Sequence, residues 1–140
     1  MKALVIDTNV FVAALRSADG ASRAVIRRCL QGQYTPCMSL ALFAEYRDVM
    51  GREPLFVASP LTSEERQALF YAFIAVCRLT EIYYLWRPNL RDEADNHVLE
   101  LAVAAGAQTI VTDNRADFFG AELHFPELRI VMPADLLKEG

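Results

Sequence analysis

The sequence predicts an α/β fold with a mostly parallel sheet. Short β-type runs alternate with segments of helical periodicity along the chain, which is the pattern of βαβ units. Acidic residues follow several of these runs, where open parallel sheets place their ligand sites. At 140 residues the chain has the length of one domain and can bury a substantial core. We therefore expect a single domain over residues 1–140.

Each element is predicted from apolar spacing and from start and stop signals. Strands are expected near residues 2–7, 34–38, 81–86, 108–112 and 129–132. Helices are expected over residues 22–30, 39–50, from 62 to about 79, and 95–105. The third of these begins with a capping-box pattern, and the fourth ends at Gly106, a residue suited to a C-cap. The loop with two prolines at 52–60 joins two helices, so we expect a helical hairpin that could flank a groove.

Composition excludes several classes of protein. The chain is 54% hydrophobic and 23% charged, which is typical of a compact globule. No apolar run approaches the roughly 20 residues that span a bilayer, and the first residues lack the pattern of a signal peptide. Three scattered cysteines, Cys29, Cys37 and Cys77, fit reduced thiols in a cytoplasmic protein. A net charge of −4 argues against a nucleic-acid coating protein but not against a nuclease.

Four acidic clusters lie where predicted elements begin or end. They are Asp7, Glu45, the pair Asp92 and Asp95, and the pair Asp113 and Asp117. Because crossover connections are right-handed, the ends of parallel strands meet at one edge of the sheet. We therefore expect these carboxylates to converge.

Helical spacing decides which of the first three clusters point inward. Glu45 shares a face with Leu42 and Tyr46, so it lies at the edge of an apolar stripe. The alternative is an exposed glutamate that pairs with Arg47 or Arg52. Asp95 turns inward by the same spacing, whereas Asp92 stands at an N-cap position, where a structural role is favoured.

The last cluster leaves its alternatives open. Asp113 or Asn114 could form a turn after the strand, and Asp117 could be an ordinary surface acid. Two carboxylates about 5 Å apart repel by roughly 3 kcal/mol at an effective dielectric near 20. Convergence therefore calls for a cation, and oxygen ligands favour Mg²⁺ or Mn²⁺ over zinc. His97 and His124 are expected to be surface residues and not ligands.

Taken together, these segments resemble the PIN-domain family, and within it the VapC-like toxins of toxin–antitoxin pairs. The matching segments are Val5-Ile6-Asp7-Thr8-Asn9-Val10, residues 44–50 with Arg52, residues 91–96 leading into 99–102, and Ile110-Val111-Thr112-Asp113-Asn114. They occur in the family's order and cover nearly the whole chain. The resemblance implies a three-layer α/β/α fold with a parallel sheet of order 3-2-1-4-5. It also implies that Asp7 and Asp113 come together where the strand order reverses.

By this resemblance the chain is expected to be a Mg²⁺- or Mn²⁺-dependent endoribonuclease that acts on single-stranded RNA. Asp7, Glu45 and Asp95 would hold the metal, with Asp117 as the preferred fourth acid and Asp113 close behind. The expected supporting residues are Thr8, Asn9, Thr112, Asn114 and Asp92. The candidates for RNA phosphate contacts are Arg16, Arg47, Arg52 and Arg91. The resemblance implies an antitoxin peptide as a partner. A second copy of the chain is expected because closed two-fold pairs are the commonest assembly, and no membrane partner is expected.

Two other functions are compatible with part of this pattern. The first is a binding module for RNA or protein that keeps the acids without turnover. The second is a phosphatase that forms an aspartyl-phosphate on Asp7. Such enzymes need a second Asp where this chain has Asn9, and a lysine near a later strand, whereas the lysines here are Lys2 and Lys138. The phosphatase is therefore disfavoured.

Overall fold

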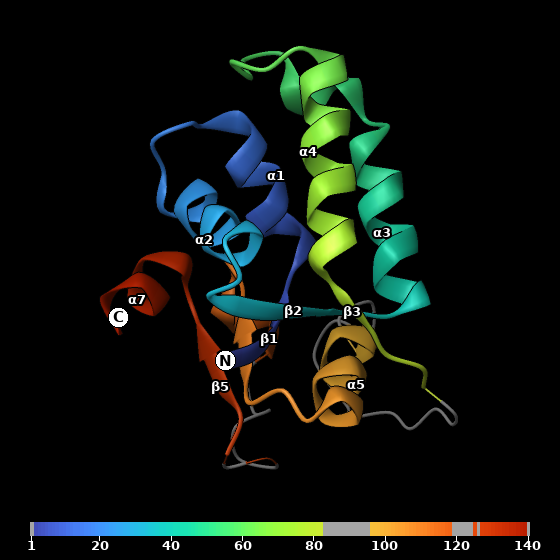
Figure 1. Cartoon of the computed structure of the whole chain (residues 1–140), viewed down its shortest axis with the longest axis vertical. Coiled ribbons are helices and arrows are strands. Elements are labelled where there is room, and N and C mark those ends of the chain that lie inside the picture. Colours follow the sequence, from blue (N-terminus) through green and yellow to red (C-terminus); the bar gives the residue numbers. More distant parts are fainter. Residues whose placement is uncertain (1, 83–95, 119–124, 126, 140) are drawn as a thin grey trace.

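A parallel sheet forms the centre of the molecule (Figure 1). The computed structural model describes residues 2–82, 96–118, 125 and 127–139. Within these residues the strands are β1 (Lys2–Ile6), β2 (Tyr34–Met38), β3 (Arg78–Leu79), β4 (Thr109–Val111) and β5 (Arg129–Val131). They form one sheet of order β3-β2-β1-β4-β5 in which every neighbouring pair is parallel. This is the predicted order.

Helices pack against both faces of the sheet. They are α1 (Thr8–Arg16), α2 (Ala21–Leu30), α3 (Leu40–Met50), α4 (Ser63–Val76), α5 (Asn96–Ala105) and α7 (Pro133–Lys138), with short 3₁₀ helices η1 (Glu53–Phe56) and η3 (Arg115–Phe118). Leu4, Val5 and Ile6 are each at most 1% exposed. Because successive strand residues point to opposite faces, β1 is covered on both sides. The α/β fold class is confirmed.

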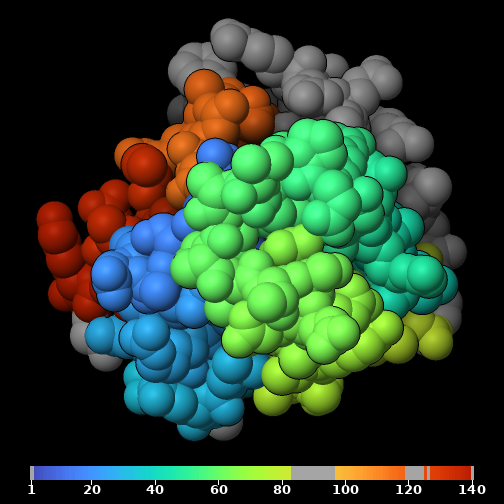
Figure 2. Space-filling model, turned by 90° about the horizontal axis from the view of Figure 1, so that it is seen from above, coloured from blue at the N-terminus to red at the C-terminus, as the bar shows by residue number. Residues whose placement is uncertain are grey.

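The expected helical hairpin is made by α3 and α4 (Figure 1). Thr62 and Glu65 form the predicted capping box at the start of α4. Large aromatic rings fill the space between the two helices, with Tyr46 stacked on Phe73 at a centroid distance of 5.9 Å. Figure 2 shows the connection between the two helices beside α1, where the Ser59 hydroxyl donates to the Leu15 carbonyl at 2.6 Å.

The third strand begins earlier than the sequence predicted. The expected helix to about residue 79 ends at Val76, and Cys77 adopts an extended conformation. Arg78 and Leu79 pair with β2, and the Thr80 amide donates to the Met38 carbonyl at 2.7 Å. The backbone donors after Cys77 therefore bind the sheet edge instead of the preceding turn. The expected strand at 81–86 was wrong in its start, and its part from residue 83 onward lies outside the described residues.

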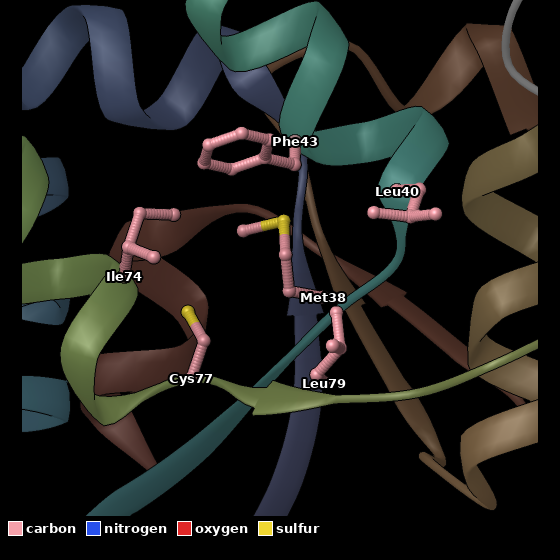
Figure 3. A pocket seen from close by; sticks show the side chains of 6 residues that line it. All are labelled: Met38, Leu40, Phe43, Ile74, Cys77 and Leu79. Carbon is pink, nitrogen blue, oxygen red and sulfur yellow. The ribbon is translucent and has the colours of Figure 1, made fainter.

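An apolar hollow lies where the hairpin meets the sheet edge (Figure 3). It is lined by Met38, Leu40, Phe43, Ile74, Cys77 and Leu79. Its lining within the described residues is apolar, which sets it apart from Asp7 and Glu45. No helix in the described ranges has the length and apolar character needed to cross a bilayer.

A buried arginine ties η1 to α4. Arg66 is 6% exposed and donates to both carboxylate oxygens of Glu53, at 2.9 and 3.1 Å. Its guanidinium also lies over the Phe56 ring, 4.7 Å from the centroid. A cation held by a carboxylate and an aromatic face can be buried without an unpaired charge. This pairing fixes η1 against α4, and η1 also contacts α1.

Tyr46 joins α3 to the end of β1. Its side chain is fully buried, and its hydroxyl donates to the Ile6 carbonyl at 2.6 Å. Ile6 is the last residue of β1, immediately before Asp7. Glu45 is the residue before Tyr46 on α3, so this hydrogen bond brings the chain positions of both acids together.

The first prediction is that Tyr46→Phe lowers the free energy of unfolding by about 1–3 kcal/mol, because it leaves the buried Ile6 carbonyl without its donor. Urea denaturation measures the loss. The matched control is Tyr71→Phe, since Tyr71 lies on α4 with 62% of its surface exposed and should change stability by less than about 0.5 kcal/mol. Equal stability of the two variants would contradict the anchoring role of Tyr46.

Candidate active site

Asp7 stands at the point where β1 passes into α1. Its amide donates to the Val111 carbonyl of β4 at 2.9 Å, and it is the N-cap residue of α1. Its carboxylate Oδ1 accepts from the Thr8 amide at 2.9 Å. The residue is only 3% exposed. The two neighbouring strands thus place a nearly buried carboxylate at the carboxyl edge of the sheet, where the strand order reverses.

Two predicted supporting residues hold the second oxygen of this carboxylate. The Thr112 hydroxyl donates to Asp7 Oδ2 at 2.9 Å. The Asn9 amide group lies 3.4 Å from the same oxygen and 3.3 Å from the Thr112 hydroxyl. The residue after β4 is therefore bound to the residue after β1, and the orientation of the carboxylate is fixed from both strands.

Glu45 reaches the same site from α3. Its Oε1 accepts from the Thr8 hydroxyl at 2.5 Å. Thr8 therefore binds both acids, with its amide on Asp7 and its hydroxyl on Glu45. The alternative that Glu45 pairs with an arginine was wrong, because Arg52 bonds Asp48 and Arg47 lies over the Phe43 ring.

His97 is a site residue that sequence reasoning missed. Its Nε2 lies 2.6 Å from Glu45 Oε2, and the two side chains are 20% and 30% exposed. The expectation that His97 is a surface residue was wrong. The available signal was its i, i+4 spacing from the buried Leu101, which turns it toward the core. His124 lies outside the described residues.

The two acids have opposite pKa shifts. Burial raises the pKa of Asp7 to about 6, the negative charges of Glu45 and Asp117 add to the rise, and the hydrogen bonds from Thr112 and Thr8 oppose it. Burial also raises the pKa of Glu45, but the hydrogen bonds from His97 and Thr8 with the charges of His97 and Arg52 outweigh it, so the net shift is downward. Asp7 therefore carries the uncompensated charge of the site.

The last acidic cluster lies beside Asp7 in a turn after β4. The Thr112 hydroxyl accepts from the Asn114 amide at 3.1 Å, and the Asn114 side chain donates to Asp117 Oδ1 at 3.0 Å. Asp113 is exposed, and its amide donates to Asn9 Oδ1 at 3.1 Å. Asp117, and not Asp113, is among the main charges that raise the pKa of Asp7. The turn after β4 is therefore held by the Thr112 hydroxyl, which bonds the amide two residues on.

Several expected site residues cannot be placed. Asp92, Asp95 and Arg91 lie outside the described residues. In the part of the chain that is described, no three His, Cys, Asp or Glu side chains form a group that could hold a metal ion. Arg16 is exposed at the end of α1, on the helix that begins at Asp7.

These features define a doubly wound α/β fold with an acidic site at its switch point. The chain belongs to the PIN domain family, which it matches over residues 3–116. PIN domains are generally nucleases and typically use divalent metals.

Among solved structures, the chain is similar to one in the crystal structure of VapBC2 from Rickettsia felis bound to a DNA fragment from their promoter. The TM-score is 0.60 and the identity 17%, over 93% of this chain and 98% of that chain. At this identity the likeness is one of fold. No curated protein matches the chain significantly.

The second prediction concerns the pH dependence of stability without metal. The pKa of Asp7 is about 6 in the folded chain against an ordinary 3.8, so the folded state binds its proton more tightly. As pH rises from about 4 to about 6, the free energy of unfolding should fall by up to about 3 kcal/mol through this group.

Asp7→Asn should remove that fall, because asparagine caps a helix equally well. Urea denaturation in EDTA should show the variant more stable than wild type by about 1–3 kcal/mol above about pH 7, and nearly equal to it near pH 4. The difference in free energy of unfolding between wild type and variant cancels the contributions of the other titrating groups. A variant less stable than wild type at neutral pH would contradict the raised pKa.

Proposed function

We propose that this chain is a metal-dependent endoribonuclease that hydrolyses phosphodiester bonds in single-stranded RNA. The observation that carries the proposal is the buried Asp7 carboxylate, whose pKa of about 6 is raised by burial and by the further negative charge of Glu45 and Asp117. Keeping such a group ionised at neutral pH costs stability unless a cation offsets it. Membership of the PIN domain family agrees with this reading.

The residues present fit a hard divalent cation. Asp7 and Glu45, which Thr8 joins, both offer carboxylate oxygens, and the described residues alone do not complete a group of three ligands. Oxygen ligands of this kind suit Mg²⁺ or Mn²⁺. In the proposal Asp95 completes the ligand set with Asp7, Glu45 and Asp117, and Asp92 caps the helix that follows.

The cation would supply Lewis-acid polarisation of the scissile phosphate. The chain's own residues would orient the reactants. Thr8 and Thr112 hold the Asp7 carboxylate in one orientation, and His97 with Thr8 does the same for Glu45.

Asp117, with Asp113 as the alternative, is proposed to position the attacking water or a second ion, because one Asp117 oxygen is held by Asn114 and its charge acts on Asp7. The attacking water gives up a proton to solvent as its oxygen bonds to phosphorus. The bond from phosphorus to the leaving ribose oxygen breaks, and that oxygen takes up a proton from solvent. No side-chain nucleophile is needed.

A toxin of a toxin–antitoxin pair is the proposed biological role, and a homodimer in the cytoplasm is the proposed form. The similarity in fold to a VapBC2 chain supports this role. The proposed antitoxin is a peptide that sets an arginine against the carboxylates, since a guanidinium binds two oxygens at once and would replace the metal's charge. Closed two-fold pairs are the commonest assembly.

The third prediction separates the metal ligands from a structural neighbour. Calorimetry should show Mn²⁺ binding by wild type and its loss in Asp7→Asn, and Mn²⁺ should raise the melting temperature of wild type only. Asp95→Asn should abolish cleavage of single-stranded RNA, whereas the control Asp92→Asn should keep most activity because asparagine still caps a helix. If Asp7→Asn binds Mn²⁺ as tightly as wild type, the proposed metal site is wrong.

The fourth prediction tests the toxin. Expression of the chain alone should slow cell growth, and Glu45→Gln should relieve the effect while keeping an oxygen to accept from Thr8. The soluble yield and melting temperature of the variant should match wild type, which excludes relief through misfolding. The wild-type chain could fail both to slow growth and to cleave a panel of single-stranded RNAs with Mn²⁺. That outcome would contradict the nuclease proposal and favour the binding module.

A further inference from the structure

A groove leaves the acidic site along the outer face of α1. Its floor is a single helical stripe made by Asn9, Val12, Ala13 and Arg16, which are spaced i, i+3, i+4 and i+7. The groove encloses about 360 Å³, which lies within the range of small-ligand sites. From Asn9 to Arg16 the helix rises about 10 Å.

The walls of the groove come from the hairpin region. Val49 of α3 and Leu55 of η1 line it beside the α1 stripe. η1 is held against α4 by the buried Arg66, which donates to the exposed Glu53, and this contact supports the Leu55 wall. At the acidic end the lining includes the exposed Asp113 and Thr8. Thr8 binds both site carboxylates.

The chemistry of the groove changes along its length. One end adjoins the carboxylates, the middle is aliphatic, and the far end carries the guanidinium of Arg16. Of the arginines expected to bind phosphate, Arg52 bonds Asp48 and Arg47 lies over Phe43. Within the described part of the chain, Arg16 has no carboxylate partner. It is therefore available to a ligand.

We propose that this groove is a nucleotide subsite for single-stranded RNA. The ribose and base next to the scissile phosphate lie on the aliphatic floor against Leu55, and Arg16 binds the following phosphate. This inference rests on the proposed nuclease function and adds the direction in which the strand leaves the site.

RNA suits this groove better than an extended peptide does. A peptide on the aliphatic middle would lose water from backbone amides that find no partner there. A base and its ribose instead present an apolar face to the floor, and their charge lies in the phosphates at the two ends. Single-stranded RNA is commonly bound by such a pairing of apolar contact with a cation on the backbone.

The experiment measures RNA binding without cleavage. Fluorescence anisotropy of a short labelled oligouridylate is followed in EDTA, at several salt concentrations. Arg16→Ala should weaken binding about five- to tenfold and lower the slope of log affinity against log salt by about one. Arg16→Lys should recover most of both. The matched control is Arg27→Ala, an exposed arginine at the end of α2, which should change neither.

A second pair of variants tests the apolar wall. Leu55→Asp should weaken binding by about tenfold or more, since it sets a charge against the RNA. Val57→Asp, at a residue that is 86% exposed just beyond η1, should have little effect. Mn²⁺ affinity by calorimetry and the melting temperature should stay at wild-type values in Arg16→Ala, which excludes damage to the acidic site.

The outcomes separate this inference from the nuclease itself. If Arg16→Ala and Leu55→Asp bind RNA as tightly as wild type, the subsite is wrong. The proposed nuclease function is not affected by that result. Absence of wild-type binding also overturns the subsite, and cleavage with Mn²⁺ then decides the nuclease separately. Equal losses of RNA affinity in Leu55→Asp and Val57→Asp would show a general effect of added negative charge. They would contradict the proposed contact between RNA and Leu55.

Discussion

The hydrogen bond from Tyr46 to the Ile6 carbonyl is the contact on which the acidic site depends. It joins α3 to the last residue of β1, so the next residue of the strand and the preceding residue of the helix are brought to one place. Those residues are Asp7 and Glu45. The aromatic rings of Phe11 and Phe73 pack around Tyr46, and this dense core keeps the phenol from moving. The site is therefore positioned by the core and not by loops.

The same arrangement opposes stability. Burial and neighbouring acids hold the pKa of Asp7 near 6, whereas a surface aspartate would ionise with no such penalty. Hydrogen bonds from Thr8 and Thr112 offset part of this cost. Replacing a destabilising group of this kind would stabilise the fold. Such groups are nevertheless common at functional sites, where activity depends on them. The ionised form of Glu45 is favoured by its hydrogen bond with His97, and its pKa is lowered.

Much of this could be predicted from the sequence because the relevant signals are local. Alternating apolar runs predict the α/β class, the family resemblance implies the strand order, and the spacing of Glu45 on its helix places it inward. The start of β3 could not be predicted, since no glycine or proline interrupts the apolar pattern before Arg78 and only pairing with Met38 decides the matter. His97 was missed because a single histidine carries no spacing partner of its own kind, and its contact with Glu45 is tertiary.

The bond between Thr112 and Asp7 spans 105 residues of the chain. A ribosome delivers the first strand long before the fourth, so the Asp7 carboxylate waits through most of synthesis without the neighbour that orients it. The acidic site is thus one of the last parts of the fold to form, as expected for a contact of such long sequence separation. An interrupted translation product that stops short of β4 would carry Asp7 and Glu45 but no assembled site.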